Sequence, residues 1–442
     1  MEKHEVLIIG GGPAAITIAK TMKQKEKITI IRPEEHSMIY CAMPYAIEGI
    51  LSLEKTLKHD KIVTDVGANL IRDYVESVNF DDKTLKTVNG DIHKYTKLII
   101  ATGAEPLLPP IEGVNLQQVM TFKTENDLRK IIHMVEKGTK EVVVVGAGAI
   151  GIELVQALNK SHIKTHLVDM FSTILHNMMD HEMVKEVQEK LENAGVIMHL
   201  GNKVSKLEGT NFVEKVVFES GENITFESNP LIVFAIGMKP SIDIFKNTKL
   251  KIGKSGIIIN NKMETSIEDV YAVGDCCEYR SGITGKVVQG KLATNAVPMG
   301  RILAKNLLGE NREYAGFYNG TATKVMDHFV GGTGLSEKVA KAHNYDYIVG
   351  KAKLTTTFPI MPCSKDVEVK LIVDKKTRKI LGGQVVSGVP VTDKVDQITM
   401  AIQYGITVDQ FVHLSYSSQP YQSFFPANNL LAHASEQILA QL

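Results

Sequence analysis

The chain has 442 residues, about three times the usual length of a domain, so we expect two or three domains. Lysine plus arginine and aspartate plus glutamate number 50 each, and this balance argues against a nucleic-acid or acidic-membrane partner. No apolar run reaches the roughly 20 residues that a membrane-spanning helix needs, and the N-terminus enters a strand without the apolar core of a signal peptide. These features predict a cytoplasmic protein.

The four cysteines are Cys41, Cys276, Cys277 and Cys363. They form no CxxC pair and no Cys/His cluster with metal-ligand spacing, so the sequence predicts no metal site. A reducing cytosol also disfavours a disulfide framework. Redox chemistry at a single thiol stays open, and the residues around each cysteine have to decide it.

The first predicted strand, at residues 5–9, leads directly into a glycine-rich turn and then into a helix at residues 16–22. The turn follows the pattern G-x-G-x-x-A, in which bare backbone lets a pyrophosphate approach the helix N-terminus. Plain packing of a strand on a helix also uses glycine-rich turns, so this copy alone leaves both interpretations open. The candidate nucleotide contacts are Gly10, Gly12, Pro13, Ala14 and Ala15.

The strand after this turn, at residues 28–31, departs from the dinucleotide pattern at its end. The pattern places an acidic residue there to bind the ribose hydroxyls, but the chain continues with Arg32. Glu34 or Glu35 follows shortly afterwards, and Glu34 is the candidate ribose contact.

The same arrangement occurs a second time, with a strand at residues 142–145 and a helix that continues through Leu158. The next strand ends in Asp169, close to the spacing at which an acid meets the ribose hydroxyls. An acid there repels a 2′-phosphate, so NADH is favoured over NADPH. The alternative is a surface aspartate at a strand end. The candidate contacts in this copy are Gly146, Gly148, Ile150, Gly151 and Asp169.

Two dinucleotide turns in one chain predict two dinucleotides that face each other. Over essentially its whole length the sequence resembles the pyridine nucleotide–disulfide oxidoreductase family, in which the first turn binds FAD and the second binds the nicotinamide nucleotide. The resemblance implies an α/β fold of two Rossmann-like dinucleotide-binding domains, for FAD and NAD, plus a C-terminal α+β dimerisation domain. The implied boundaries are residues 1–112 and 245–320 for FAD, 113–244 for NAD(H), and 321–442 for the interface domain.

Further segments match the family and supply the remaining candidate cofactor contacts. The family leaves its FAD domain at the turn 101–103 and returns at Gly237. Asp275 ends a strand and would bond the flavin ribityl chain, and the helix that starts near Ala293 would direct its N-terminus at the flavin pyrimidine. The contacts implied in these segments are Ala101, Thr102, Gly103, Gly237, Gly274, Asp275, Ala293 and Thr294.

The segment around Cys41 resembles the active-site stretch of the single-cysteine branch of the family, which contains CoA-disulfide reductases, NADH oxidases and NADH peroxidases. The two-cysteine reductases need a second cysteine near position 46, which is Ala46 here, so an internal disulfide is excluded. In the family this cysteine starts a helix against the flavin, where the helix N-terminus favours the thiolate. The alternative is a buried structural cysteine. The matching residues are Ser37, Cys41, Pro44, Tyr45 and Gly49.

The residues that distinguish acceptors match no single template. Family peroxidases and water-forming oxidases carry a histidine in the first glycine-rich turn, and this chain has none there. CoA-disulfide reductases use two tyrosines from the partner subunit; Tyr416 matches one position, and the other falls near residues 355–366, which hold no tyrosine. Lys20 and Lys23 either suit CoA phosphates or form a solvated helix face. Cys363 of a partner subunit could resolve Cys41.

The C-terminal third contains strand-like runs followed by helical stretches, the order of an α+β domain. It matches the family's interface domain, which forms a two-fold homodimer with shared active sites. Our main hypothesis is a reductase that passes electrons from NADH through FAD to Cys41 and on to a disulfide, persulfide or polysulfide, such as CoA disulfide. The alternatives are an NADH oxidase or peroxidase that reduces O2 or H2O2 through a Cys41 sulfenic acid, and a redox-sensing or electron-delivery flavoprotein that docks a protein partner.

Overall fold

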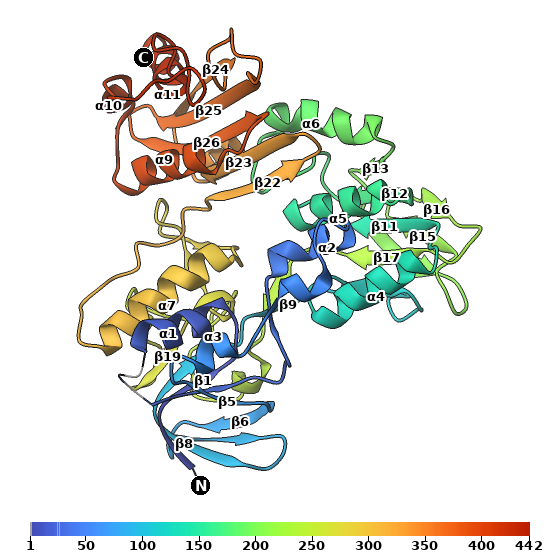
Figure 1. The fold of residues 1–442 in the computed structure, drawn as a ribbon, viewed down its shortest axis with the longest axis vertical. Helices are drawn as coiled ribbons and strands as arrows, with labels where there is room; N and C mark the ends of the chain where they lie inside the picture. The colour runs from blue at the N-terminus through green and yellow to red at the C-terminus, as the bar shows by residue number, and fades with distance from the viewer. Residues whose placement is uncertain (1, 24, 26) are drawn as a thin grey trace.

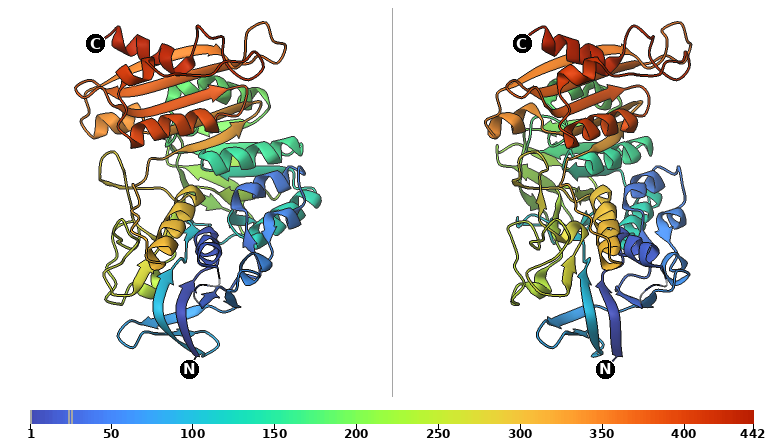
Figure 2. Two further views of the ribbon diagram at one scale, coloured as in Figure 1. Left: turned by 60° about the vertical axis from the view of Figure 1, so that its left-hand side comes forward. Right: turned by 90° about the vertical axis from the view of Figure 1, so that its left-hand side faces the viewer.

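The computed structural model describes residues 2–23, 25 and 27–442 of the chain, in which three large sheets organise the fold. Figure 1 shows the N-terminal strands at one end, a green α/β unit to one side and the orange-red C-terminal third at the opposite end. Both views of Figure 2 agree that the two chain termini lie at opposite ends of the long axis. No helix in the described part of the chain has the length and apolar character to cross a bilayer.

The first sheet joins strands from both ends of the first 300 residues. Its apolar strands β1 and β8 are parallel neighbours, and β19 pairs with β8 although it comes much later in the chain. The parallel part of this mixed sheet is covered on both faces, which explains why β1 and β8 end in buried apolar runs, at residues 6–9 and 98–100. The strands are β5 (Asn69–Ile71), β2 (Ile28–Ile31), β1 (Glu2–Ile9), β8 (Ile92–Ile100), β7 (Thr84–Thr87), β6 (Val75–Asn79) and β19 (Val270–Ala272).

Two helices pack side by side on this sheet, α1 (Pro13–Met22) and α7 (Ala293–Leu307) (Figure 1). Their backbones approach so closely at Gly300 that a Cβ there would lie 2.8 Å from the carbonyl oxygen of Ala14. Although α7 and β19 come late in the chain, they therefore complete the unit that begins with β1.

The second sheet is fully parallel, and its strands alternate with helices along the chain. The strands, in spatial order, are β10 (Val119–Thr121), β17 (Leu231–Phe234), β11 (Glu141–Val145), β12 (Lys164–Asp169) and β13 (Ile197–Leu200). Its helices are α4 (Glu125–Glu136), α5 (Ala149–Lys160) and α6 (His181–Asn193). A small antiparallel sheet of β14 (Val204–Glu208), β15 (Lys215–Phe218) and β16 (Asn223–Thr225) follows β13 in the chain.

The two nucleotide-type units are linked by a pair of crossing segments. β9 (Ala104–Pro106) carries the chain out and β18 (Met238–Pro240) carries it back, and the two pair antiparallel. The Thr102 hydroxyl donates to the carbonyl of Ser241 at 2.6 Å, which ties the crossings together beside the predicted turn 101–103.

The third sheet is antiparallel and lies under helices at the C-terminal end (Figure 1). The three strand-like runs of the sequence form its β24, β25 and β26, and two further strands precede them. Its strands are β22 (Thr321–Val325), β23 (His328–Gly334), β26 (Ile380–Ser387), β25 (Asp366–Asp374) and β24 (Tyr347–Thr355). The helices are α8 (Glu337–Ala342), α9 (Thr392–Gln403), α10 (Val408–Val412) and α11 (Leu430–Leu439).

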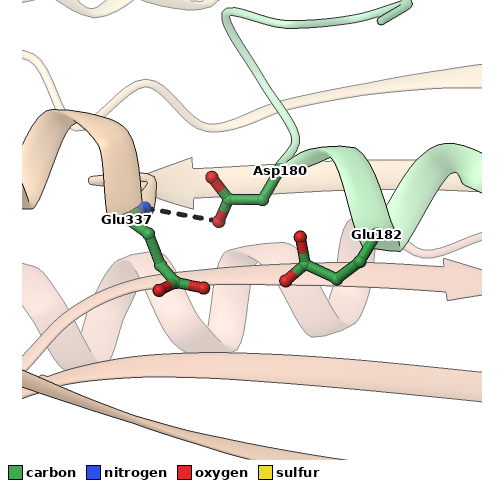
Figure 3. Close-up of side chains that lie close together, drawn as sticks. All are labelled: Asp180, Glu182 and Glu337. Atoms are coloured by element: carbon green, nitrogen blue, oxygen red, sulfur yellow. Dashed lines mark hydrogen bonds between the residues drawn. The ribbon is translucent and has the colours of Figure 1, made fainter.

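A cluster of charges fastens the second sheet's α6 to the third sheet. Asp180 and Glu182, at the start of α6, turn their carboxylates toward Glu337 of α8 (Figure 3). The Lys370 side chain, 0% exposed, fills the space between them: its Nζ lies 2.7 Å from Asp180 Oδ2 and also pairs with Glu182 and Glu337. Because the protein supplies its own cation, this group of three acids is an ion cluster and not a metal site.

Candidate active site

The first glycine-rich turn has a packed side and an open side. Gly10 has φ +106°, and a Cβ there would collide with the carbonyl oxygen of Ala101. Gly12 caps the N-terminus of α1, and a Cβ on Gly12 would have no neighbour within 4 Å. Pro13 follows at the first helical position, where its missing N–H costs nothing. The turn therefore presents open backbone at a helix N-terminus, which fits a pyrophosphate.

Arg32 accounts for the missing acid at the end of β2. Its side chain lies across Gly11, where a Cβ would collide with Arg32 Cδ, and its guanidinium pairs with Asp60. Arg72 pairs with the same carboxylate and donates to the Glu34 carbonyl at 2.9 Å. Two arginines thus hold the backbone of the loop that carries Glu34, whose side chain is exposed. The sequence predicted neither Asp60 nor Arg72 in this role, because both lie outside the motif.

The second turn repeats the construction of the first. Gly146 has φ +115°, and a Cβ there would lie 2.5 Å from the carbonyl oxygen of Ala235. Gly148 caps α5 and has open space around it, whereas a Cβ on Gly151 would collide with the Gly146 carbonyl. Ile150, in the first turn of α5, is 44% exposed.

Asp169 is a buried residue and not a surface aspartate, since it is only 7% exposed. Its Oδ2 accepts the Ala147 N–H at 2.6 Å and its Oδ1 accepts the Phe171 N–H at 2.8 Å. A carboxylate has about four acceptor positions, so each oxygen keeps one for a ribose hydroxyl. Asp169 thus orders the second turn and remains suited to bind a nucleotide.

Asp275 lies between two lysines from distant segments. Burial raises its pKa, and Lys123 and Lys291 oppose this effect. Tyr279 donates its hydroxyl to Asp275 Oδ1 at 3.4 Å. Lys123 stands before α4, and its Nζ lies 4.0 Å from the centre of the Tyr40 ring, next to Cys41. No motif in the sequence indicates a role for Lys123, because it lies outside both glycine-rich turns.

The remaining predicted flavin contacts come from the start of α7, from Gly274 beside Asp275, and from the turns at the two crossing segments. Ala293 and Thr294 occupy the first turn of α7, and Asn295 beside them has a buried Nδ2 with no partner within the described residues. Gly274 has φ +77° and Gly103 has φ +71° with open space around its Cβ position. On the return crossing, the Gly237 carbonyl accepts the Leu107 N–H at 2.9 Å. The open backbone and the unpaired amide fit a bound flavin nucleotide.

Cys41 is exposed and lies in a single 3-10 turn, η1 (Tyr40–Ala42), just before the short helix α2 (Met43–Ile47). It therefore precedes the N-cap of α2, Ala42, instead of starting a long helix. Ser37 of β3 (Ser37–Met38) is buried, and its hydroxyl oxygen has no partner in the described part of the chain. The alternative of a buried structural cysteine is wrong for Cys41.

An acid from the second unit, Glu153, lies close to Tyr45 in the short helix that follows Cys41. Burial raises the pKa of Glu153 of α5, and the Thr323 hydroxyl donates to its carboxylate at 2.7 Å. The pKa of Tyr45 is raised by burial and by the charges of Glu153 and Cys41. No sequence motif marks Glu153, because the contact between α5 and α2 that brings it to Tyr45 joins distant segments.

The other cysteines and Tyr416 lie apart from this group. Cys276 and Cys277, which follow Asp275 in the chain, are fully buried with their Sγ atoms 4.0 Å apart. Tyr416 is 42% exposed and donates to the Pro426 carbonyl, at the rim of a cavity of about 730 Å³ in the C-terminal third. Cys363 is exposed on a loop of the same third.

Comparisons with known proteins agree with this arrangement. The family model for pyridine nucleotide-disulphide oxidoreductases matches residues 4–300, and the model for their dimerisation domain matches residues 321–423. An NADH oxidase of Methanocaldococcus jannaschii is 32% identical and aligns over 99% of each chain. A CoA-dependent NAD(P)H sulfur oxidoreductase of Pyrococcus furiosus is 31% identical over 94% of this chain and 96% of its own. The structure of an NAD-dependent persulfide reductase from A. fulgidus superposes with a TM-score of 0.92 at 28% identity, over 99% of this chain and 83% of that chain.

Proposed function

Because the chain belongs to the pyridine nucleotide-disulphide oxidoreductase family, we propose that it passes electrons from NADH through FAD to Cys41 and from there to a sulfur acceptor. Family membership makes it an NAD(P)H-dependent flavoenzyme with two nucleotide-binding domains and a C-terminal dimerisation domain. The proposed acceptor is a disulfide, persulfide or polysulfide, such as CoA disulfide. The observation that carries the proposal is the exposed Cys41 thiol, which has no second cysteine beside it.

The two glycine-rich turns support one binding site for each nucleotide. FAD would be held by the first turn, by Ser37, by the turn 101–103 and by Asp275; when bound, it accepts hydride and delivers electrons in pairs. The second turn and Asp169 would hold the nicotinamide nucleotide. Asp169 supports NADH as the donor, since its carboxylate would repel the 2′-phosphate of NADPH.

The sulfur chemistry would take place at Cys41 in two steps. The thiolate attacks one sulfur of the acceptor, the acceptor S–S bond breaks, and a mixed disulfide with Cys41 forms as the first thiolate leaves. An electron pair from NADH then cleaves the mixed disulfide, which releases the second thiolate and restores Cys41. One proton balances the reaction, and Glu153, whose pKa burial raises, is placed to hold a proton near Tyr45.

The homodimer would complete the site. The C-terminal match to a dimerisation domain and the exposed Tyr416 support a two-fold pair in which Tyr416 of the partner subunit approaches Cys41. Four of the relatives bear on the acceptor: three are named as sulfur or polysulfide/persulfide oxidoreductases, and the A. fulgidus protein as a persulfide reductase.

A parallel anaerobic assay with CoA disulfide, polysulfide and hydrogen peroxide tests the proposal. We expect NADH oxidation with a sulfur acceptor, and we expect Cys41→Ser to abolish it. Cys363→Ser removes the other exposed thiol, and unchanged turnover in this variant would dispose of a resolving role for Cys363 of the partner subunit. Rapid NADH oxidation with oxygen alone that survives Cys41→Ser would overturn the proposal.

The second candidate is an NADH oxidase, which the similarity to the M. jannaschii protein favours. In that case Cys41 would cycle through a sulfenic acid, and oxygen or peroxide would support turnover better than any sulfur compound. A third outcome, reduced enzyme that persists with every small acceptor, would favour a protein acceptor.

A further inference from the structure

Lys58 is held in front of the active-site cysteine by a short β ladder. It belongs to β4 (Leu57–Lys58), which pairs antiparallel with β3 so that Lys58 lies opposite Ser37. Beyond this pair, the Ile39 N–H donates to the Thr56 carbonyl at 2.7 Å. The strand that carries Lys58 is therefore fixed to the segment that leads into η1 and Cys41.

Among the residues that the structure describes, the Lys58 ammonium has no carboxylate partner. Its side chain is partly buried, and no hydrogen bond or ion pair joins it to another residue in the part of the chain that the structure describes. Burial lowers the pKa of Lys58 most, the charge of Cys41 raises it, and Lys20 of α1 lowers it further. The charges that act on this ammonium are thus those of a thiol and a second cation.

The lysines nearby differ from Lys58 in this respect. Lys160 pairs with Glu48, and Lys123 lies beside the carboxylate of Asp275. A cation that stays unpaired while partly buried is costly unless an anion from outside the chain neutralises it. The position beside Cys41 means that this anion would meet the reacting sulfur.

We propose that Lys58, with Lys20 behind it, forms an anion subsite at Cys41 that selects acceptors whose sulfur chain carries a negative charge, such as hydropolysulfides and persulfide anions, over neutral disulfides. The inference rests on the proposed sulfur-reductase function and specifies its substrate class. Lys58 acts as a positioning residue: it offsets the repulsion between the Cys41 thiolate and an approaching anion.

The step balances without a further reactant. The Cys41 thiolate attacks the terminal SH sulfur of the hydropolysulfide, a bond from Cys41 Sγ to that sulfur forms, and the adjacent S–S bond breaks so that the shortened polysulfide anion leaves. An electron pair from NADH then cleaves the Cys41 persulfide; hydrosulfide leaves, and the thiolate returns. An anion is present beside Lys58 before and after each bond change, so the positive charge of Lys58 stabilises every state of the reaction.

The first test measures alkylation of Cys41 without any turnover. In a Cys363→Ser background, the rates with anionic iodoacetate and neutral iodoacetamide are compared at the Cys41 peptide by mass spectrometry. Lys58→Gln should lower the iodoacetate-to-iodoacetamide rate ratio by about 2- to 5-fold, the range of a partly exposed ion pair. Lys58→Arg should restore the ratio, and Lys55→Gln, on the exposed surface of η2 (Leu53–Thr56), should leave it unchanged.

The second test compares acceptors. Lys58→Gln should reduce kcat/KM for tetrasulfide by a similar factor and leave kcat/KM for the neutral 2-hydroxyethyl disulfide unchanged. An unaltered alkylation ratio, or an equal loss with both acceptors, would overturn the proposal. A lowered ratio in a protein that reduces no sulfur compound would support the anion subsite and refute the sulfur-reductase function.

Discussion

Replacing Lys370 with methionine is the sharpest test of how α6 is docked on the third sheet. The change keeps the length of the side chain and removes the only cation at the centre of Asp180, Glu182 and Glu337 among the described residues. Removal of one partner from a buried ion pair costs about 3–5 kcal/mol, because the other charge is left buried without compensation.

The structure places the expected cost near 3 kcal/mol, the lower end of that range. Asp180 keeps the amide of Gln384 at 2.7 Å, and Glu337 keeps the hydroxyl of Tyr347 at 3.0 Å. Glu182 is partly exposed and keeps Lys351 at 3.2 Å. Lys351→Met is the matched control, since it removes an exposed cation from the same cluster and should cost less than about 1 kcal/mol.

The assay is denaturant unfolding at several pH values, read by the midpoint and by hydrogen exchange in α6. Burial raises the pKa of Glu182, but the hydrogen bond and charge of Lys370, a backbone hydrogen bond and Lys351 together outweigh it and hold that pKa at about 2. A pKa below the unfolded value of about 4.3 contributes stability above that pH and loses it as pH falls toward 2. The gap between wild type and Lys370→Met should therefore narrow below pH 4. Equal effects of the two lysine variants, or a gap independent of pH, would refute the reasoning.

Three further predictions concern the nucleotide sites and acid stability. Gly12→Ala should leave the melting temperature unchanged but weaken FAD binding at least about 10-fold, measured by flavin titration, whereas Gly10→Ala should fail to fold because of its φ of +106° and the Ala101 carbonyl. Asp169→Asn should lower the kcat/KM preference for NADH over NADPH by about 10-fold, the worth of one charge-assisted hydrogen bond, and an unchanged preference would show that Asp169 only orders the turn. Burial lowers the pKa of His166 and His199, so both residues contribute stability above the unfolded pKa of about 6.5, and this stability is lost as pH falls. Between about pH 6.5 and 5, the melting temperature of His199→Gln should therefore fall less than that of the wild type.

The sequence predicted the elements whose signals are local. A glycine pattern between an apolar strand and a helix depends on neighbours within about 30 residues, and both copies have this form in the structure. The expected strand at residues 142–145 extends by one residue to Glu141 in β11. The strand β23 lacked a signal because its glycines, such as Gly331 and Gly332, carry no side chain to mark a buried face.

The residues that complete the site could not be predicted, because packing between distant segments brings them together. Lys123 comes from the segment before α4 and Glu153 from α5, yet both lie beside η1 and α2. For Arg32, the sequence identified the residue but not its contacts. The sequence identified it as a departure from the dinucleotide pattern, but only the fold shows that its side chain covers Gly11 and pairs with Asp60.

Overall charge and local charge lead to different conclusions about this chain. The balance of acids and bases in the whole chain argues against polyanionic partners. It does not describe the local electrostatic field at the candidate site, where the charges of Lys123 and Lys291 act on Asp275 and the charge of Cys41 acts on Lys58. A reduction path delivers negative charge to the flavin and then to sulfur. Fixed cations in a partly buried site stabilise such charge without reorganisation at the moment of transfer. A chain of zero net charge can therefore be built for electron delivery when its cations gather where the electrons arrive.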